Sequence, residues 1–407
     1  MKCLSFIAAG LCSAIVASTF SYSAHAQSQP PIKIGVTTAV QLQVGRDTQE
    51  AVKMAIEEIN ASGGVLGRKL EMIVADETEI PETGINAIRK LTAEDKVDVL
   101  VGGYTSGVTL AQIPHITKAK TIYLGVGAAS PAVTARVKSR YDENKYIFRV
   151  FPINSGHQAR QMTTFLADFV GKELGLKKIA IVGENAKWVQ DLVPILKKGA
   201  VEAGADVTFT ELFDTQTSDF SPLFSKVRDS GAQFLTVILS HASSDIFAKQ
   251  WHDSQFPMPY GGVDVKSMDG DFCERIGGKS VSEFAGNFAV RAPLTPKTVA
   301  FFDAFKQRTG RVPVYTALGA NDAVHIYAEA VKKAGSTNAD DVIKALEPTS
   351  YVGIAGLIEF DENHDVKAGG KHPNLLFAQW RADCSREVVY PKELRTAEPI
   401  MPPWIKK

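Results

Sequence analysis

The sequence has no net charge, because 45 lysine and arginine residues balance 45 aspartate and glutamate residues. Proteins that bind nucleic acid or anionic membrane surfaces usually present an excess of basic side chains. The balance therefore argues against both kinds of partner. Beyond the first two dozen residues the sequence also lacks a long apolar run, so it predicts no further segment that could span a membrane.

Motifs for catalysis and metal binding are missing as well. The histidines show no H-E-x-x-H spacing, no G-x-S-x-G turn is present, and no cysteine is placed with a histidine as a nucleophile. The segment 125–130 half-matches a dinucleotide-binding loop but lacks its third glycine. We therefore expect no enzyme, no bound metal and no cofactor.

Cysteine is scarce, with four residues in the whole chain. Cys3 and Cys12 fall in the first segment, which leaves Cys273 and Cys384 as the candidates for one disulfide. Two separately buried thiols are the alternative. If the bond forms, it closes a loop of about a hundred residues, for which chain entropy suggests about 4–5 kcal/mol of stabilisation at most.

The N-terminal segment has the pattern of a secretory signal peptide. A basic start at Lys2 is followed by mostly apolar or small residues and then by an Ala-x-Ala pattern that ends at Ala26. A membrane anchor is the alternative, but serines and a threonine interrupt the apolar run. We predict cleavage after Ala26, which removes residues 1–26.

The rest of the chain alternates between apolar strands and amphipathic helices. Its length of about 380 residues exceeds what one core usually serves, so two domains are expected. Such alternation predicts an α/β fold with parallel sheets covered on both faces. Strands are predicted at 32–37, 97–102, 121–125, 178–183, 206–212, 234–239, 356–360, 375–380 and 388–390, and late helices at 298–309, 315–334 and 340–346.

Two segments about 136 positions apart share one pattern. VDVLVGGYTSGVTLAQI and AQFLTVILSHASSDIFAKQ each run from an apolar strand through a serine-bearing turn into a helix. A hydroxyl and free N–H groups at a helix start can receive a carboxylate. The alternative is that Ser106, Ser240 and Ser243 only cap their helices. The repetition favours a cleft between two similar lobes.

Several longer motifs resemble one known family. They are IKIGVTT, AIEEINASGGVLGRKLEMIVAD, VGGYTS, ASPAVTAR, IAIVGENAKW, DFSPLFSKVRDSGAQF and YVGIAGLIEFDENHDVK followed by QW and VVYP. Together they resemble type I periplasmic solute-binding proteins of ABC importers, in the leucine/isoleucine/valine-binding branch. The resemblance implies two Rossmann-like lobes joined by three interlobe crossings. Lobe 1 would hold residues 27–150 and 288–366, and lobe 2 would hold residues 151–287 and 367–407.

The resemblance also implies a ligand site between the lobes. Ser106 would bind the ligand carboxylate, the backbone of Gly127 its head group, and Asp264 an α-ammonium group, while Trp188 would form an aromatic wall. Ala129 stands where amino-acid binders often have threonine, and Ser240-His241 replaces a frequent aromatic residue. The missing threonine argues against an α-amino acid ligand, whereas Ser240-His241 suggests a more polar pocket than that of a leucine binder. The remaining candidate ligand contacts are Gln43, Tyr104 and His241.

The expected function follows from these features. The chain would be the extracytoplasmic solute-binding component of an ABC import system, a monomer located in the periplasm. It would close its lobes on a small polar ligand, an amino acid or a related amide, amine or carboxylate, and deliver it to the permease subunits. The alternative is a ligand-sensing receptor module of the same fold that acts on a regulatory partner.

Overall fold

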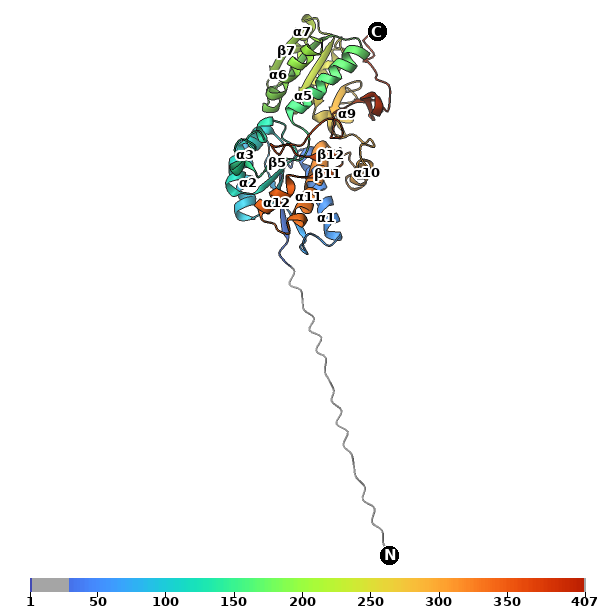
Figure 1. Ribbon diagram of the computed structural model, residues 1–407. Coiled ribbons are helices and arrows are strands. Elements are labelled where there is room, and N and C mark those ends of the chain that lie inside the picture. The colour runs from blue at the N-terminus through green and yellow to red at the C-terminus, as the bar shows by residue number, and fades with distance from the viewer. Residues whose placement is uncertain (2–28, 406–407) are drawn as a thin grey trace.

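The computed structural model describes Met1 and residues 29–405. The predicted signal peptide and its cleavage site fall almost entirely within residues 2–28, which lie outside the described part of the chain. None of the described helices is both long and apolar enough to cross a membrane. The described chain forms two lobes, each built on its own sheet (Figure 1).

Lobe 1 contains a five-stranded parallel sheet in the order β2-β1-β3-β4-β5. The central strands β3 and β4 are buried along their whole length, as strands covered on both faces should be. The elements in chain order are β1 (Ile32–Thr38), α1 (Gln43–Ala61), β2 (Leu70–Asp76), α2 (Pro81–Arg89), η1 (Lys90–Glu94), β3 (Val99–Gly102), α3 (Ser106–Ala119), β4 (Ile122–Gly125), η2 (Pro131–Val133), α4 (Tyr141–Asn144) and β5 (Ile147–Arg149).

Lobe 2 contains a seven-stranded mixed sheet in the order β14-β13-β10-β9-β8-β6-β7. Strands β6 to β10 are parallel, whereas β13 and β14 add antiparallel neighbours at one edge. The first part of the lobe comprises α5 (Ser155–Thr164), η3 (Phe165–Glu173), β6 (Lys178–Glu184), α6 (Lys187–Glu202), β7 (Asp206–Phe213), α7 (Ser221–Asp229), β8 (Phe234–Leu239), α8 (Ser243–Asp253), β9 (Tyr260–Asp264), η4 (Lys266–Met268), α9 (Phe272–Arg275) and β10 (Phe284–Asn287).

The chain passes between the lobes three times. It enters lobe 2 after β5, returns to lobe 1 after β10, and enters lobe 2 again between β12 and β13. On its return, α11 packs against α1 and β3, and α12 packs against α11. The returning elements are α10 (Thr298–Thr309), α11 (Tyr315–Ala334), α12 (Ala339–Leu346), β11 (Ser350–Val352) and β12 (Leu357–Glu359), and the last elements of lobe 2 are β13 (Leu376–Trp380), β14 (Arg386–Tyr390) and η5 (Lys392–Leu394).

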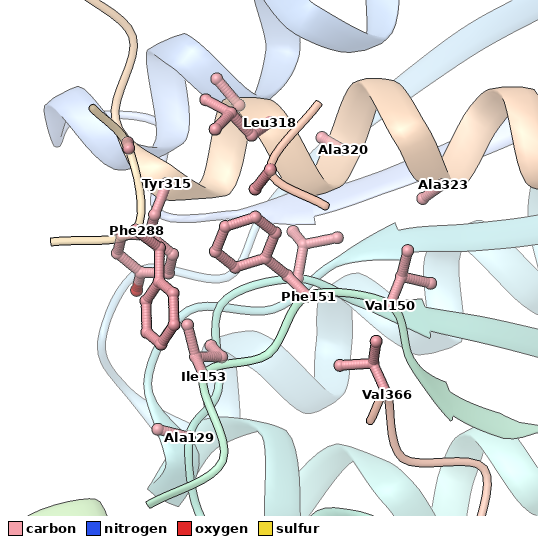
Figure 2. Packing of buried hydrophobic residues seen from close by; sticks show 14 of the residues in the cluster. Ala129, Val150, Phe151, Ile153, Phe288, Tyr315, Leu318, Ala320, Ala323 and Val366 are labelled. Atoms are coloured by element: carbon pink, nitrogen blue, oxygen red, sulfur yellow. The ribbon is translucent and has the colours of Figure 1, made fainter. Parts of the chain in front are cut away.

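These observations confirm the predicted α/β fold class with two lobes and three crossings. The predicted strands and late helices agree with the structure to within about two residues at either end. Aromatic residues pack where two of the crossings pass each other. The ring of Phe151, just after β5, lies 5.8 Å from that of Phe288 and 6.0 Å from that of Tyr315 (Figure 2). The crossings are therefore held together by close apolar packing.

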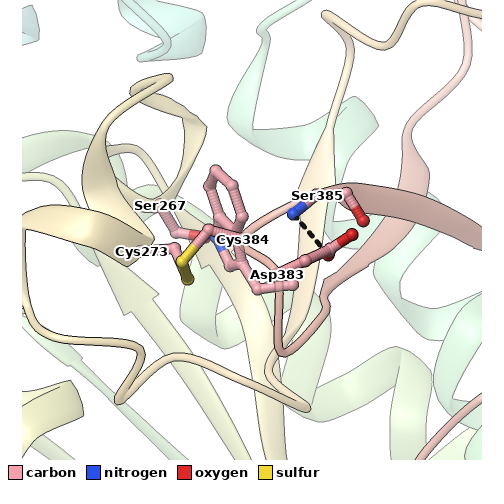
Figure 3. Close-up of a disulfide and its surroundings, with 6 residues drawn as sticks. Ser267, Cys273, Asp383, Cys384 and Ser385 are labelled. Carbon is pink, nitrogen blue, oxygen red and sulfur yellow. Dashed lines mark hydrogen bonds between the residues drawn. A yellow bond between two sulfur atoms is a disulfide. The ribbon is translucent and has the colours of Figure 1, made fainter.

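A disulfide joins two parts of lobe 2. Cys273 in α9 is bonded to Cys384 in the turn between β13 and β14, with their Cα atoms 5.5 Å apart (Figure 3). The two residues are 111 positions apart in the sequence. The turn itself is held by a hydrogen bond from the Ser385 backbone N–H to the Asp383 carboxylate. The disulfide therefore connects β13 and β14 to the earlier part of the same lobe.

Candidate functional site

A cavity of about 250 Å³ lies between the lobes, at the carboxyl ends of strands from both sheets. Lobe 1 and the crossings supply Glu79, Pro81, Tyr104, Thr105, Ser106, Gly107, Val108, Gly127, Ala129, Ile153, Phe288 and Tyr315. Lobe 2 supplies Gln158, Asn185, Ala186, Lys187, Trp188, Thr215, Ser240, His241, Val263, Val265 and Met268. The volume suits one small molecule, because pockets for drug-sized ligands span roughly 300–1,000 Å³.

Ser106 is the first residue of α3, directly after the turn that follows β3. Its hydroxyl oxygen accepts hydrogen bonds from the backbone N–H groups of Ala129 at 3.1 Å and Ser130 at 3.0 Å. With its oxygen engaged in this way, the hydroxyl can donate its hydrogen to an acceptor in the cavity. The first N–H groups of α3 have no partner within the helix. This corner of the cavity therefore offers several donors to an anion.

A buried glutamate fixes the turn before Ser106. The Glu77 carboxylate accepts from the backbone N–H of Tyr104 at 2.7 Å and from the Thr37 hydroxyl and the Gln112 amide, each at 2.9 Å. Burial raises the pKa of Glu77 to about 7, although these three donors act in the opposite direction. The carboxylate sets the direction of the turn without facing the cavity itself.

Trp188 lies at the start of α6 and forms part of the lobe 2 wall. Its indole Nε1–H donates to the Ser240 hydroxyl at 3.2 Å, and this bond fixes the plane of the ring. Its backbone carbonyl accepts from the Ser155 hydroxyl at 2.9 Å. The ring is therefore held in place before any ligand arrives.

His241 lies on lobe 2's side of the cavity, between two carboxylates. Its Nδ1 lies 2.7 Å from the Glu184 carboxylate, and its Nε2 lies 3.8 Å from the carboxylate of Glu79 on lobe 1. Burial acts to lower the pKa of His241, but the hydrogen bond to Glu184 and the charges of both glutamates outweigh it, so the pKa rises. His241 of lobe 2 and Glu79 of lobe 1 thus approach each other beside the cavity.

Two further hydrogen bonds join the lobes directly. The Tyr104 hydroxyl donates to the Ser240 carbonyl at 3.2 Å, and the Ser130 hydroxyl donates to the Asp191 carboxylate at 2.5 Å. With the Glu79–His241 pair, they connect both walls of the cavity. The lobes therefore touch around the space where a ligand would lie.

Six of the eight residues that the sequence singled out for ligand contact line the cavity: Tyr104, Ser106, Gly127, Ala129, Trp188 and His241. Gly127 is needed for a reason other than ligand approach. A Cβ at this position would lie 2.0 Å from the Gly103 carbonyl oxygen, so the close packing of two backbone segments requires glycine. Ala129 presents only a methyl group, while its backbone carbonyl accepts from Ser155.

The structure does not bring Asp264 or Gln43 to the cavity, which corrects both sequence-based assignments. Asp264 ends β9 with its carboxylate pointing into lobe 2, where it accepts from the Ser244 hydroxyl at 2.5 Å. Side chains alternate along a strand, so its neighbour Val263 faces the cavity instead. Gln43 is buried at the start of α1, where its amide donates to Asp47 at 3.2 Å.

Sequence reasoning missed several residues of the site. Phe288 lies just after β10, where the chain crosses back into lobe 1, and Tyr315 is the first residue of α11. Neither residue belongs to a motif recognised in the sequence. Glu79 follows the carboxyl end of β2, and this position alone could have indicated it. The other omissions, such as Met268 and Gln158, carry no local signal.

The sequence pattern of the periplasmic binding protein family matches residues 31–384. The chain belongs to the periplasmic binding protein family. The leucine-, isoleucine-, valine-, threonine-, and alanine-binding protein of Pseudomonas aeruginosa is 25% identical over 382 residues, which cover 92% of this chain and 95% of that relative. At the level of this family the chain is a solute-binding protein rather than an enzyme.

Solved structures of this family share the fold. A leucine binding protein, LivK, from Thermotoga maritima has a TM-score of 0.76 at 20% identity, covering 88% of this chain and 97% of that one. A solute binding protein of an ABC transporter from Rhodopseudomonas palustris, in complex with 3,4-dihydroxy benzoic acid, has a TM-score of 0.72 at 22% identity, covering 86% of this chain and 93% of that one.

Proposed function

We propose that this protein binds a small carboxylate in the cavity between its lobes and delivers it to the permease of an ABC importer. The observation that carries the proposal is the donor cluster at Ser106, which faces a cavity lined by both lobes. The ligands named for the two relatives, five amino acids for one and a dihydroxybenzoic acid for the other, share a carboxyl group. A carboxylate is therefore the ligand feature on which this donor cluster and the relatives agree.

The electrostatics of the cavity support an anionic ligand. Lys187 and His241 line lobe 2's side of the cavity, and the start of α3 adds a partial positive charge on the other side. Lys187 also pairs with Asp191, which keeps it at the start of α6. A bound carboxylate would bridge the lobes and stabilise their closed arrangement.

The proposal includes the remaining sequence-based assignments. The mature protein would act in the periplasm as a monomer after cleavage following Ala26. Lobe 1 would comprise residues 27–150 and 288–366, and lobe 2 residues 151–287 and 367–407. The ligand contacts would be made by Tyr104, Ser106, Gly127, Trp188 and His241, with Ala129 forming an apolar part of the wall.

Substitution of Ser106 tests the carboxylate site. In Ser106→Ala the ligand loses one charge-assisted hydrogen bond, which contributes about 1.5–3 kcal/mol, so the affinity should fall roughly 10- to 150-fold. Calorimetric titration should use whichever small carboxylate is identified by mass spectrometry among the compounds released when the purified protein is denatured.

Two further variants make the result specific. Ser106→Thr keeps a hydroxyl group and should restore most of the affinity, whereas Thr117→Ala removes a hydroxyl at the far end of the same helix and should leave the affinity unchanged. Equal affinities of wild type and Ser106→Ala would reject the role of this hydroxyl. The absence of any carboxylate among the released compounds, together with no binding to a panel of small carboxylates, would reject the function.

A further inference from the structure

Because of the register of β9, the side chain of Asp264 does not face the cavity. Val263 and Val265 line the cavity, while Asp264 between them is buried on the other side of the strand. The Asp264 carboxylate is fully engaged there, since it accepts from the Ser244 hydroxyl at 2.5 Å and from the backbone N–H groups of Lys266 at 3.0 Å and Ser267 at 3.3 Å. This part of the wall is therefore apolar.

The one carboxylate among the described residues that line the cavity already has the imidazole of His241 as a neighbour. It belongs to Glu79, whose oxygen lies 3.8 Å from Nε2 of His241. The imidazole is held in this position by Glu184 at 2.7 Å. A ligand ammonium group at this point would have to compete with the imidazole of His241 for the same carboxylate.

Two backbone carbonyl groups near the donor cluster are also engaged. The Gly127 carbonyl accepts from the Tyr315 hydroxyl at 3.2 Å, and the Ala129 carbonyl accepts from the backbone N–H of Ser155 at 2.8 Å and from its hydroxyl at 3.1 Å. Ala129 itself has no side-chain oxygen. An α-ammonium group carries three donors and is costly to bury without partners.

The remaining walls suit a flat apolar body. Tyr104, Trp188, Phe288 and Tyr315 bring four aromatic side chains to one cavity of about 250 Å³. Met268 and the two valines of the β9 region fill further parts of the wall. Aromatic side chains pack well against an aromatic ring in offset or edge-to-face arrangements.

We propose that the ligand is an aromatic carboxylic acid that lacks an α-ammonium group. The carboxylate binds at Ser106 and the start of α3, and the ring lies among the aromatic walls, against the apolar side chains of Val263 and Val265. This inference rests on the proposed function and narrows its ligand class. It sets the chain apart from relatives that bind amino acids, because the wall next to β9 has no acid to receive an ammonium group.

Matched pairs of compounds test the inference on the wild-type mature protein. 3-Phenylpropionate and L-phenylalanine differ in the α-ammonium group, and so do 4-methylpentanoate and L-leucine. Calorimetric titration should give at least a tenfold lower dissociation constant for 3-phenylpropionate than for L-phenylalanine, and 3-phenylpropionate should also bind more tightly than 4-methylpentanoate. If either amino acid binds as tightly as its matched carboxylate, or more tightly, the inference is overturned and the proposed function still stands.

A substitution on β9 tests the physical cause. Val263→Glu places a carboxylate on the cavity side and should reduce the preference for 3-phenylpropionate over L-phenylalanine at least tenfold. Val263→Gln has a similar size without the charge and should leave the preference within about threefold of wild type. An unchanged preference in a folded Val263→Glu protein would overturn the assigned cause. If that variant fails to fold, the wild-type comparison of the matched pairs still decides the inference.

Discussion

The two halves of the cleft are each built on a buried glutamate beneath a turn, but the donors around the two glutamates differ. In lobe 1, Glu77 accepts only from neutral groups: the Tyr104 backbone, the Thr37 hydroxyl and the Gln112 amide. Burial therefore dominates, and the pKa of Glu77 rises to about 7. This glutamate supports its turn without a compensating positive charge.

In lobe 2, Glu184 accepts from the backbone N–H groups of Ser240 at 2.8 Å and His241 at 2.9 Å, from the Ser243 hydroxyl at 2.6 Å and from the imidazole of His241. Burial acts to raise the pKa of Glu184, but the hydrogen bond and charge of His241 outweigh it and the pKa is lowered. This glutamate is ionised and paired.

The difference assigns separate tasks to the two walls. Lobe 1 presents a donor cluster whose geometry is fixed by neutral hydrogen bonds. Lobe 2 presents a titratable group, His241, which also reaches Glu79 across the cleft. The pH dependence of the contact between the lobes should therefore arise from His241, because it reaches across the cleft, whereas protonation of Glu77 acts on the turn within lobe 1. Substitutions of the two glutamates should have unequal costs.

The largest expected effect comes from replacing the two glutamates in parallel. In Glu184→Gln an amide N–H₂ group must face at least one backbone N–H, because both carboxylate oxygens accept from backbone groups. The substitution also removes the charge that pairs with the imidazole of His241. Removing one partner of a buried pair typically costs about 3–5 kcal/mol. We expect this loss in the free energy of unfolding, measured by urea denaturation with circular dichroism as the probe.

Glu77→Gln is the matched control. One oxygen still accepts from Tyr104, and the new amide faces the Thr37 hydroxyl and the Gln112 side chain, both of which can reverse their roles. Reversal of the Gln112 amide would bring into use its Oε1, which has no partner among the described residues, at the expense of the hydrogen bond from its Nε2 to the Gly84 carbonyl at 3.2 Å. The expected loss is about 1 kcal/mol, the order of one net hydrogen bond. Similar losses in both variants would contradict the proposed difference between the lobes.

The sequence predicted the fold well because its signals are local. Strand–helix alternation needs only short-range patterns, and the ranges 234–239, 298–309 and 315–334 match β8, α10 and α11. The internal repeat correctly indicated two similar turns that face each other across the cleft. Tyr104 and Ser240, 136 positions apart, occupy equivalent turns, and the hydrogen bond between them joins the two lobes.

The site was predicted less completely, because the direction of a side chain depends on long-range packing. Asp264 and Val263 are adjacent on β9, and a shift of one residue in strand register exchanges the cavity face for the core face. Nothing in the local sequence sets that register. Phe288 and Tyr315 reach the cavity because the chain crosses back into lobe 1, and a local pattern cannot show where a crossing ends.

The disulfide gives a second, smaller test of the comparison. The described elements of lobe 1, from β1 to β5 and from α10 to β12, contain no cysteine, so within the described chain only lobe 2 is cross-linked. The double variant Cys273→Ser/Cys384→Ser should lose about 2–4 kcal/mol, because the unfolded chain regains the freedom of a loop of 111 residues. Urea denaturation measures the loss, and hydrogen exchange compares the loss of protection between the two lobes.

The control for this experiment is the thiol content of the wild type. Titration of the unfolded, unreduced protein should detect no free thiol from Cys273 or Cys384. Two reactive thiols would show that the bond is absent. Equal loss of exchange protection in both lobes of the double variant would show that the cross-link does not act on lobe 2 alone.

The smallest expected effect is the pH dependence of His241. Because the folded state raises the pKa of His241 above its usual 6.5, its protonation stabilises the protein fully below about pH 6.5, and this contribution is lost as the pH rises through the folded-state pKa. Glu184 and Glu79 favour the imidazolium, while Lys266 opposes it.

We expect wild type to lose about 0.5–1.5 kcal/mol of unfolding free energy between about pH 6 and pH 9, relative to His241→Asn, which keeps a donor for Glu184 but does not titrate. Urea denaturation at both pH values measures the difference, and Glu79→Gln should show part of it because this variant removes only the charge from the opposite lobe. If wild type and His241→Asn show the same pH dependence, the imidazole does not carry the charge that links the two walls, and the contrast between the glutamates reduces to hydrogen bonding alone.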